Sequence, residues 1–360
     1  LEETAVELLC ETVESEFYSP QDVLFVPAKS SEYMFLVVDG SFRYSQEPTT
    51  SKVLDAYEQD VDAGAWVCEA ALWSDWTHVG KLEAETQVKV FKLSYEELAS
   101  ILEVLKMVSM VTRSYARSFY LRLTTACPPH SDWPTDLGLP FTSAADLLSK
   151  DVGVGLLRAA CTSGRISLMP AESAQLEDEI RHETCALQQT ERGELERLVA
   201  VHCINITRPN GDILVHLGSY HADRGLIDAC CKLPGHKRPH GELPKAALER
   251  LLATPALSHF STGIKLLHVE HDVQVKEDRF PGIRSKYLRT VQQCLLQPGF
   301  EPDLPVASAN GALSRQFDSF AVLTIPINED TAGLYCWMSQ TTFEFASSPN
   351  GLKLLQGWLA

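Results

Sequence analysis

The strongest structural signal in this chain is the run YMFLVVDGSF, residues 33–42. Its first six residues are apolar or aromatic, which favours a buried strand, and the dipeptide Asp39-Gly40 favours the tight turn of a β-hairpin. A second strand pattern precedes it at Val23–Val26, and Ser41–Tyr44 continues beyond the turn. We therefore predict a β-meander in this part of the chain.

Helical patterns flank this β-rich region on both sides. Residues 1–16 carry apolar positions at helical spacing among glutamates. The alternating run Val88–Leu93 predicts a further strand, after which Ser94 and Glu97 form the signature of a capping box. A long helix should therefore extend from Ser94 to about Leu123. We predict an antiparallel β-roll with flanking helices over residues 1–125.

Two motifs in this region resemble those of cyclic nucleotide-binding domains, which occur in cyclic-nucleotide-gated and voltage-gated potassium channels. The run at residues 33–42 is similar to a hairpin of that family. The run GAWVCEAAL, residues 64–72, looks like the family's phosphate-binding cassette, usually written G-x-x-F-G-E-x-A-L. The strand and long helix that follow match the family's closing strand and lid helix, so the resemblance covers about residues 1–123.

The resemblance implies a site for cAMP or cGMP. In the family, backbone amides of the cassette cradle the cyclic phosphate, a glutamate accepts a hydrogen bond from the ribose, and an arginine pairs with the phosphate. Glu69 stands at the glutamate position, and His78 stands where the arginine is expected. The candidate ligand-binding residues are Gly64, Cys68, Glu69, Ala70, Ala71 and His78.

The cassette departs from the family pattern at two positions. His78 cannot make the two-point contact of a guanidinium, and Cys68 places a side chain where glycine permits close approach of the backbone. Both changes oppose binding of a cyclic nucleotide. The alternative is a degenerate regulatory module, like the homologous domain of several voltage-gated potassium channels that does not bind the nucleotide.

The best domain boundary is a proline-rich segment. Four prolines lie within Cys127–Pro140 without sustained periodicity. Helical patterns follow at Ala144–Cys161 and Ala174–Leu195, the second with many charges. We therefore predict a linker and helical connector over residues 126–195 and a second domain over residues 196–360.

The second domain is identified by its resemblance to the Nudix family. Its run LPGHKRPHGELPKAALERLL, residues 233–252, looks like a decayed Nudix box, G-x5-E-x7-R-E-U-x-E-E-x-G-U, and implies an α/β/α sandwich. A working box binds Mg²⁺ through helix glutamates, but this chain has Leu251, Thr254 and Pro255 in their places. We therefore favour a domain without enzymatic activity. Bound Mg²⁺ is expected only if the domain is active. The residues of the degenerate box are Gly235, Lys237, Glu242 and Arg250.

Composition excludes several classes of protein. The chain has 48 acidic and 31 basic residues and a formal charge of −17, which opposes binding to nucleic acid. No run is long and apolar enough to predict a transmembrane helix. The ten cysteines include no C-x-x-C pair, which favours reduced cytosolic thiols and predicts no metal site. Because the chain begins with Leu1 and no secretory leader follows, we expect a piece of a longer protein.

These observations predict a cytoplasmic regulatory segment, with an ion channel as its parent protein. For such a channel we expect two partners, a membrane domain upstream in the parent chain and a small nucleotide ligand. We also expect homo-oligomerisation. Regulation would be allosteric, through movement of the lid helix. The alternatives are a soluble Nudix-type nucleoside-diphosphate hydrolase, and a soluble cyclic-nucleotide-binding scaffold or kinase-regulatory protein.

Overall fold

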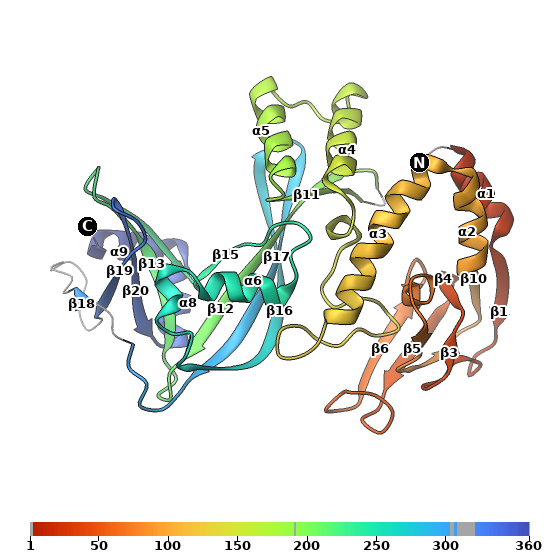
Figure 1. Ribbon diagram of the computed structural model, residues 1–360, viewed down its shortest axis with the longest axis horizontal. Coiled ribbons are helices and arrows are strands. Elements are labelled where there is room, and N and C mark those ends of the chain that lie inside the picture. Colours follow the sequence, from red (N-terminus) through yellow and green to blue (C-terminus); the bar gives the residue numbers. More distant parts are fainter. Residues whose placement is uncertain (1–2, 191, 303–305, 308–320, 360) are drawn as a thin grey trace. The chain divides into compact units, whose positions relative to one another are not determined.

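The computed structural model describes residues 3–190, 192–302, 306–307 and 321–359 (Figure 1). The chain divides into two compact units. Unit 1 contains the described residues within Leu1–Cys127 and Asp132–Gly155, and unit 2 contains those within Pro128–Ser131 and Leu156–Ala360. Helices and strands occur in both units, so the fold is of the mixed α+β type.

Unit 1 is built around a β-roll of short antiparallel strands. Two four-stranded sheets, with strand orders β1-β10-β4-β7 and β2-β9-β5-β6, are accompanied by the small pair β3-β8. The elements are β1 (Glu14–Tyr18), β2 (Val23–Phe25), β3 (Ser30–Ser31), β4 (Tyr33–Asp39), β5 (Ser41–Gln46), β6 (Tyr57–Asp62), β7 (Trp66–Val67), the 3-10 helix η1 (Glu69–Leu72), β8 (Trp76–Thr77), β9 (Lys81–Ala84) and β10 (Val88–Ser94).

The turn at Gly40 joins the two sheets, so our prediction of a hairpin between the flanking strands was wrong. Strand β4 pairs with β10 and β7, whereas β5 pairs with β6 and β9. Gly40 has a φ of +83°, and a Cβ there would lie 2.3 Å from the carbonyl oxygen of Gln87. Glycine therefore lets the chain pass close to the start of β10. Strands β4 and β5 then enter different sheets instead of pairing with each other.

The core of the β-roll comes from the alternating pattern of the strands. Inward side chains of β4, β5, β9 and β10 are almost completely buried, and their outward neighbours face solvent or the helices. The most deeply buried are Val37, Phe42, Tyr44, Leu82, Ala84, Val88 and Val90. Burial of each large apolar side chain contributes about 1.5–3 kcal/mol, so this cluster holds the two sheets together.

The predicted long helix is interrupted. The capping box forms as expected, because Ser94 Oγ accepts from the Glu97 amide at 3.2 Å and Glu97 Oε2 accepts from the Ser94 amide at 2.6 Å. Helix α2 (Tyr95–Val104) then ends at Leu105, whose φ and ψ are −106° and 79°. Leu105 is buried against Ile101, and α3 (Lys106–Thr125) begins after it. Helix α1 (Glu3–Thr12) precedes the roll.

The segment that we predicted as a linker and connector is divided between the units. Residues 132–155 belong to unit 1, where Leu137 packs on the core of the β-roll and Leu147 packs on Phe119 of α3. A 3-10 helix, η2 (Ala144–Asp146), and α4 (Lys150–Thr162) follow. Residues 132–155 are therefore a packed part of unit 1, whereas the described residues within 156–195 belong to unit 2.

The predicted helix over residues 174–195 was wrong in its second half. Helix α5 (Pro170–Arg181) ends at His182. Glu183 has a φ of +59°, which is incompatible with a right-handed helix. The chain then forms β11 (Ala186–Gln189), which pairs with β12. Sheet pairing thus overrides the helical pattern of charges in this segment.

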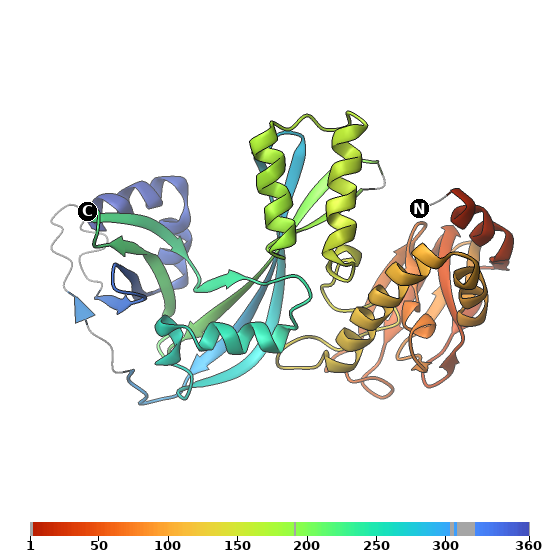
Figure 2. The same cartoon turned by 45° about the horizontal axis from the view of Figure 1, so that its top comes forward.

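Unit 2 is a ten-stranded mixed sheet with helices on both faces (Figure 2). The main path is β16-β17-β12-β13-β20-β19-β18, and β12 and β17 run parallel. Its further elements are β12 (Leu195–Thr207), β13 (Ile213–His221), β14 (Leu226–Lys232), β15 (Gly235–Lys237), α6 (Pro244–Leu252), α7 (Pro255–Ser258), β16 (Ile264–Phe280), β17 (Ile283–Leu296), β18 (Val306–Ala307), β19 (Val322–Pro326), β20 (Thr331–Met338), α8 (Gln340–Ser347) and α9 (Pro349–Leu359). Helices α6 and α7 pack on one face, and α8 and α9 pack on the other. Assignment of this unit to the Nudix fold stays a prediction.

A row of polar side chains crosses this sheet. His236 of β15 lies opposite His202 of β12, His202 lies opposite Thr290 of β17, and Thr290 lies opposite His271 of β16. His202 is fully buried, and neither of its ring nitrogens has a hydrogen-bond partner among the described residues. Burial, with the nearby charge of Arg238, lowers the pKa of His202 to about 3.

This buried histidine makes the stability of unit 2 sensitive to acid. Below pH 6.5, the ordinary value, the unfolded chain binds a proton at position 202 that the folded chain rejects, so the free energy of unfolding falls as the pH drops. Above that pH His202 is unprotonated in both the folded and the unfolded chain, and it no longer contributes to the pH dependence of stability. We expect His202→Leu to lose less stability than the unmodified chain between pH 7.5 and 5, by about 1.4 kcal/mol for each pH unit below 6.5.

Urea unfolding of the full chain at both pH values measures this difference. The matched control is His182→Leu, because the side chain of His182 is 70% exposed. Equal acid sensitivity of the His202 variant and the unmodified chain would show that His202 is not responsible.

Candidate functional site

The residues of the predicted cassette lie on the turn from β6 to β7 and on η1. Gly64 has a φ of +93°, and its amide donates to the Val37 carbonyl at 2.8 Å. Cys68 precedes η1 in the left-handed region, with φ 60° and ψ 29°. Ala70 and Ala71 are buried within η1. Position 68 thus has the backbone conformation that glycine adopts freely, but it carries a buried thiol.

A carboxylate from outside the cassette lies at its centre. Asp136 follows α3 in the proline-rich segment and is completely buried. Its backbone carbonyl accepts a hydrogen bond from the Cys68 amide at 2.6 Å. Its side chain accepts five hydrogen bonds, from Tyr44 Oη at 2.9 Å, Trp76 Nε1 at 2.8 Å, His78 Nδ1 at 2.9 Å, the Val79 amide at 3.0 Å and the Gly80 amide at 2.8 Å.

These donors come from two strands, β5 and β8, and from the turn between β8 and β9. Tyr44 reaches the carboxylate from β5 by lying against Gly80, where a Cβ would stand 2.4 Å from the tyrosine ring. Burial, and then the charge of Asp136, raise the pKa of the Tyr44 hydroxyl, which keeps it a donor. The two consecutive amides of Val79 and Gly80 point at one carboxylate oxygen, an arrangement typical of anion-binding turns.

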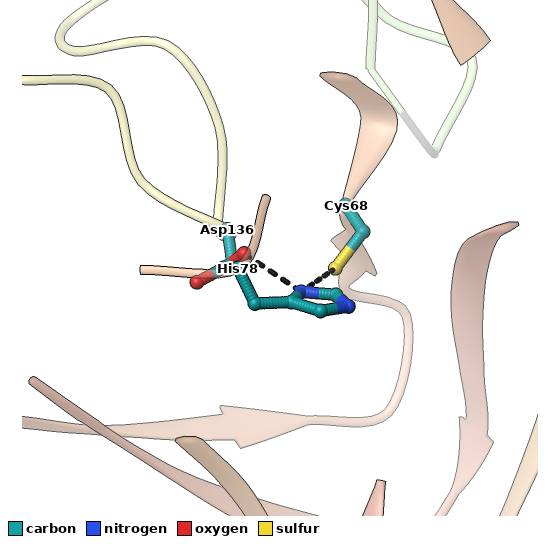
Figure 3. A group of neighbouring side chains, drawn as sticks. All are labelled: Cys68, His78 and Asp136. Carbon is teal, nitrogen blue, oxygen red and sulfur yellow. Dashed lines mark hydrogen bonds and ion pairs between the residues drawn. The ribbon is translucent and has the colours of Figure 1, made fainter. Parts of the chain in front are cut away.

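His78 connects the carboxylate with the thiol. Its ring stacks on Phe25 with a centroid separation of 4.0 Å and an interplanar angle of 4°. Its Nδ1 lies 2.9 Å from Asp136 Oδ1 and 3.7 Å from Cys68 Sγ (Figure 3). Burial, and then the nearby carboxylate, raise the pKa of the Cys68 thiol well above its usual range. The histidine is therefore held by the protein's own groups.

Glu69 is bound to helix α3. Its Oε1 accepts from Tyr115 Oη at 2.7 Å and from Trp73 Nε1 at 3.1 Å. Tyr115 and Phe119 of α3 belong to the cluster that also contains Trp73. The carboxylate that the resemblance assigns to a ribose hydroxyl thus accepts from a tyrosine hydroxyl instead.

The structure brings together Cys68 and His78, two of the predicted site residues, and adds Asp136 to them. Sequence reasoning missed Asp136 because it lies 58 residues after His78, in a segment whose prolines indicate a linker. The sequence feature that indicates packing of this segment is the apolar pair Leu137 and Leu139, because a solvated linker needs no apolar side chains. Both pack on unit 1, Leu137 on the core of the roll and Leu139 beside η1 and α3.

Two clefts lie on unit 1 beside these residues. One of about 1130 Å³ is lined by η1, α2 and α3, and the other, of about 450 Å³, is lined by β2, β4 and the ring of His78. Neither is lined by Asp136 or Glu69. Asp136 is completely covered by protein, whereas Glu69 is partly exposed.

The residues of the predicted Nudix box are engaged in structural contacts. Arg250 makes a two-point ion pair with Glu242 at 2.8 and 2.9 Å and also donates to the Lys237 carbonyl at 3.1 Å. Gly235 of β15 lies against β12, where a Cβ would meet Cys203 Sγ at 2.7 Å. Within the described part of the chain, the group of three side chains close enough to share a metal ion is Cys68, His78 and Asp136, and α6 contributes none of them.

Comparisons with known proteins concern the shape of part of the chain. No protein-family model and no curated protein sequence matches it. A cyclic nucleotide-binding-like protein from Brucella abortus is 21% identical over 28% of this chain and 84% of that chain, with a TM-score of 0.25. The N-terminal domain of a transcriptional regulator from Streptomyces coelicolor is 19% identical over 35% and 87%, with a TM-score of 0.30. The c-di-GMP-responsive regulator CLP from Xanthomonas campestris is 19% identical over 33% and 56%, with a TM-score of 0.27.

The hydrogen bonds of the buried Asp136 carboxylate predict a large contribution to the stability of unit 1. Asp136→Ala leaves the indole of Trp76 and the amides of Val79 and Gly80 without their acceptor, and each buried unpaired donor costs about 1–3 kcal/mol. We expect the free energy of unfolding of unit 1 to fall by about 3–5 kcal/mol, as for the loss of one partner from a buried charged network.

Urea unfolding followed by tryptophan fluorescence checks this value. Asp75→Ala is the matched control, because Asp75 lies in the loop between η1 and β8 but is exposed. If the two variants lose equal stability, the hydrogen bonds of Asp136 do not hold unit 1 together.

Proposed function

We propose that unit 1 is a regulatory module of the cyclic nucleotide-binding type whose anion site is occupied by its own chain. The observation that carries this proposal is the set of five donors around the buried Asp136 carboxylate. A carboxylate and a cyclic phosphate are both monoanions that accept hydrogen bonds from convergent backbone amides. Asp136 thus acts as an internal substitute for the phosphate of a ligand.

The two departures from the family pattern support this proposal. A guanidinium at position 78 would suit the two exposed oxygens of a phosphate, whereas the smaller imidazole makes one 2.9 Å contact with the carboxylate. The amide of Cys68, at the start of η1, donates to the carbonyl of the same Asp136 residue. Positions that serve a nucleotide in the family therefore serve this segment of the chain.

The occupied site gives the module two states. In the closed state Asp136 fills the anion site and Tyr115 of α3 holds Glu69. In the open state a ligand or partner replaces Asp136, and a hydroxyl of that ligand replaces Tyr115 on Glu69. Because the same event releases the 132–149 segment and α3, binding at the roll is coupled to the helices that follow it.

The larger protein that uses this module stays a prediction. The cytoplasmic part of an ion channel is our first expectation, and a soluble scaffold or kinase-regulatory chain is the alternative. Among the described residues, no helix combines the length and the hydropathy needed to cross a membrane. For unit 2 we propose a non-catalytic role, because Glu242 is committed to Arg250 and the helix-borne carboxylates of a magnesium site are replaced.

Calorimetric titration of the full chain with cAMP and cGMP tests the proposed self-occupied site. The affinity of the unmodified chain is reduced by the small fraction of molecules in the open state. We expect the double variant Asp136→Ala, His78→Arg to bind a cyclic nucleotide at least tenfold more tightly than the unmodified chain, because it vacates the site and restores the guanidinium. Adding Glu69→Ala should abolish that gain.

Two outcomes would contradict the self-occupied site. One is tight binding by the unmodified chain that the Asp136 substitution leaves unchanged. The other is a folded double variant, verified by circular dichroism, that binds neither nucleotide. The control variant is Asp75→Ala with His78→Arg, which restores the guanidinium but leaves Asp136 in place and should bind no better than the unmodified chain.

A further inference from the structure

Cys68, His78 and Asp136 aim three different donor atoms at one small volume (Figure 3). The thiol, the imidazole nitrogen and the carboxylate oxygen all lie within 4.8 Å of one another, and all three residues are buried. They come from three separate parts of unit 1: the start of η1, the turn between β8 and β9, and the segment after α3. Their convergence is therefore a product of the tertiary fold.

The contacts of His78 exclude one familiar use of these residue types. In a Cys-His-Asp relay the thiol and the carboxylate bind opposite nitrogens of the imidazole. Here both approach the same nitrogen, Nδ1, at 3.7 and 2.9 Å. One nitrogen cannot pass a proton between them as a relay requires. A sulfur, an imidazole nitrogen and a carboxylate oxygen within 4.8 Å of one another are, once the thiol and this nitrogen are deprotonated, the donor atoms that a cation binds.

We propose that Cys68, His78 and Asp136 form a binding site for a divalent transition metal ion, with Zn²⁺ as the favoured ion. Zinc accepts thiolate, imidazole and carboxylate ligands at about 2.0–2.3 Å, so tetrahedral coordination separates the donor atoms by about 3.3–3.6 Å. The sulfur to nitrogen distance of 3.7 Å is close to this value, and the nitrogen to oxygen distance of 2.9 Å needs to open by about 0.4 Å.

Charge and protons balance when the ion binds. The Cys68 thiol releases its proton to solvent, and the His78 proton resides on Nε2, so that Sγ and Nδ1 offer lone pairs. The two positive charges of the ion match one thiolate and one carboxylate, which leaves no net charge in the buried site. Asp136 Oδ1 exchanges the His78 contact for the ion, and its other oxygen keeps the amides of Val79 and Gly80.

The backbone at Cys68 is a second, independent observation. A non-glycine residue at φ 60° costs of order 1–2 kcal/mol, and the resemblance places a glycine at this position. The cysteine makes no side-chain cap for η1 that would compensate for the strain. What the side chain provides is a sulfur beside His78, 3.7 Å from its Nδ1.

A bound ion would fasten the segment that carries Asp136 to the roll. Its three ligands join η1, the β8–β9 turn and the 132–149 segment, which touch one another otherwise through hydrogen bonds and apolar contacts. The metal proposal stands on these three residues alone and does not depend on whether a nucleotide can replace Asp136.

Cobalt substitution of the full chain tests the site. The chain is stripped with a chelator, loaded with Zn²⁺ or Co²⁺, dialysed and analysed for metal content by mass spectrometry. We expect about one ion per chain and a near-ultraviolet absorption band from a cobalt–thiolate bond, a band that the histidine row of unit 2 cannot produce. Cys68→Gly and His78→Gln should each remove the band, and Cys10→Ser, which changes an exposed thiol, should leave it unchanged.

Thermal unfolding with and without Zn²⁺ keeps the test decisive if a variant folds poorly. Cys68→Gly relieves the backbone strain, so without metal we expect it to melt at or above the temperature of the unmodified chain. With Zn²⁺ the unmodified chain should gain several degrees and Cys68→Gly should gain none. Absence of bound metal and of the cobalt band in the unmodified chain, or a band and a thermal shift that survive Cys68→Gly, would overturn the proposal.

Discussion

The buried Asp136 carboxylate is the constraint on which the architecture of unit 1 depends. A carboxylate removed from water costs several kcal/mol unless the protein replaces its hydration. Five donors do so here, and they determine how the side chain of Tyr44 crosses Gly80 and how the turn after β8 directs two amides inward. Unless another acceptor replaces Asp136, departure of the proline-rich segment leaves all of these donors unpaired, so the segment is a part of the fold.

This constraint also explains why the departures from the cassette pattern belong together. His78 in place of arginine leaves room for a carboxylate that arrives on the protein's own chain, and Cys68 in place of glycine puts its amide and its thiol beside the same residue. Glu69 is likewise satisfied internally, by Tyr115 of α3. Each of these substitutions opposes an external nucleotide, but together they form a complete internal hydrogen-bond network, which is the basis of the proposed closed state.

Unit 2 distributes its polar groups differently. Arg250, in the last turn of α6, makes a two-point ion pair with Glu242 before the helix and donates to the Lys237 carbonyl of β15. Residues of a motif associated with metal binding thus make structural contacts here. Behind α6, His202 lies buried in neutral form within a row that crosses four strands. Hydrogen bonds stabilise the buried polar groups of unit 1, whereas His202 of unit 2 is tolerated only while it stays uncharged.

Patterns that depend on near neighbours could be predicted from the sequence alone: the alternation of Val88–Leu93 and the capping box of Ser94 and Glu97. The tertiary structure decided that β4 and β5 belong to different sheets and that Asp136, 58 residues after His78, is the hydrogen-bond acceptor beside that histidine. The reason is physical. Strand periodicity and helix capping are set by interactions over a few residues, whereas the partner of a buried charge is chosen by desolvation, which acts between any residues that the fold brings into contact.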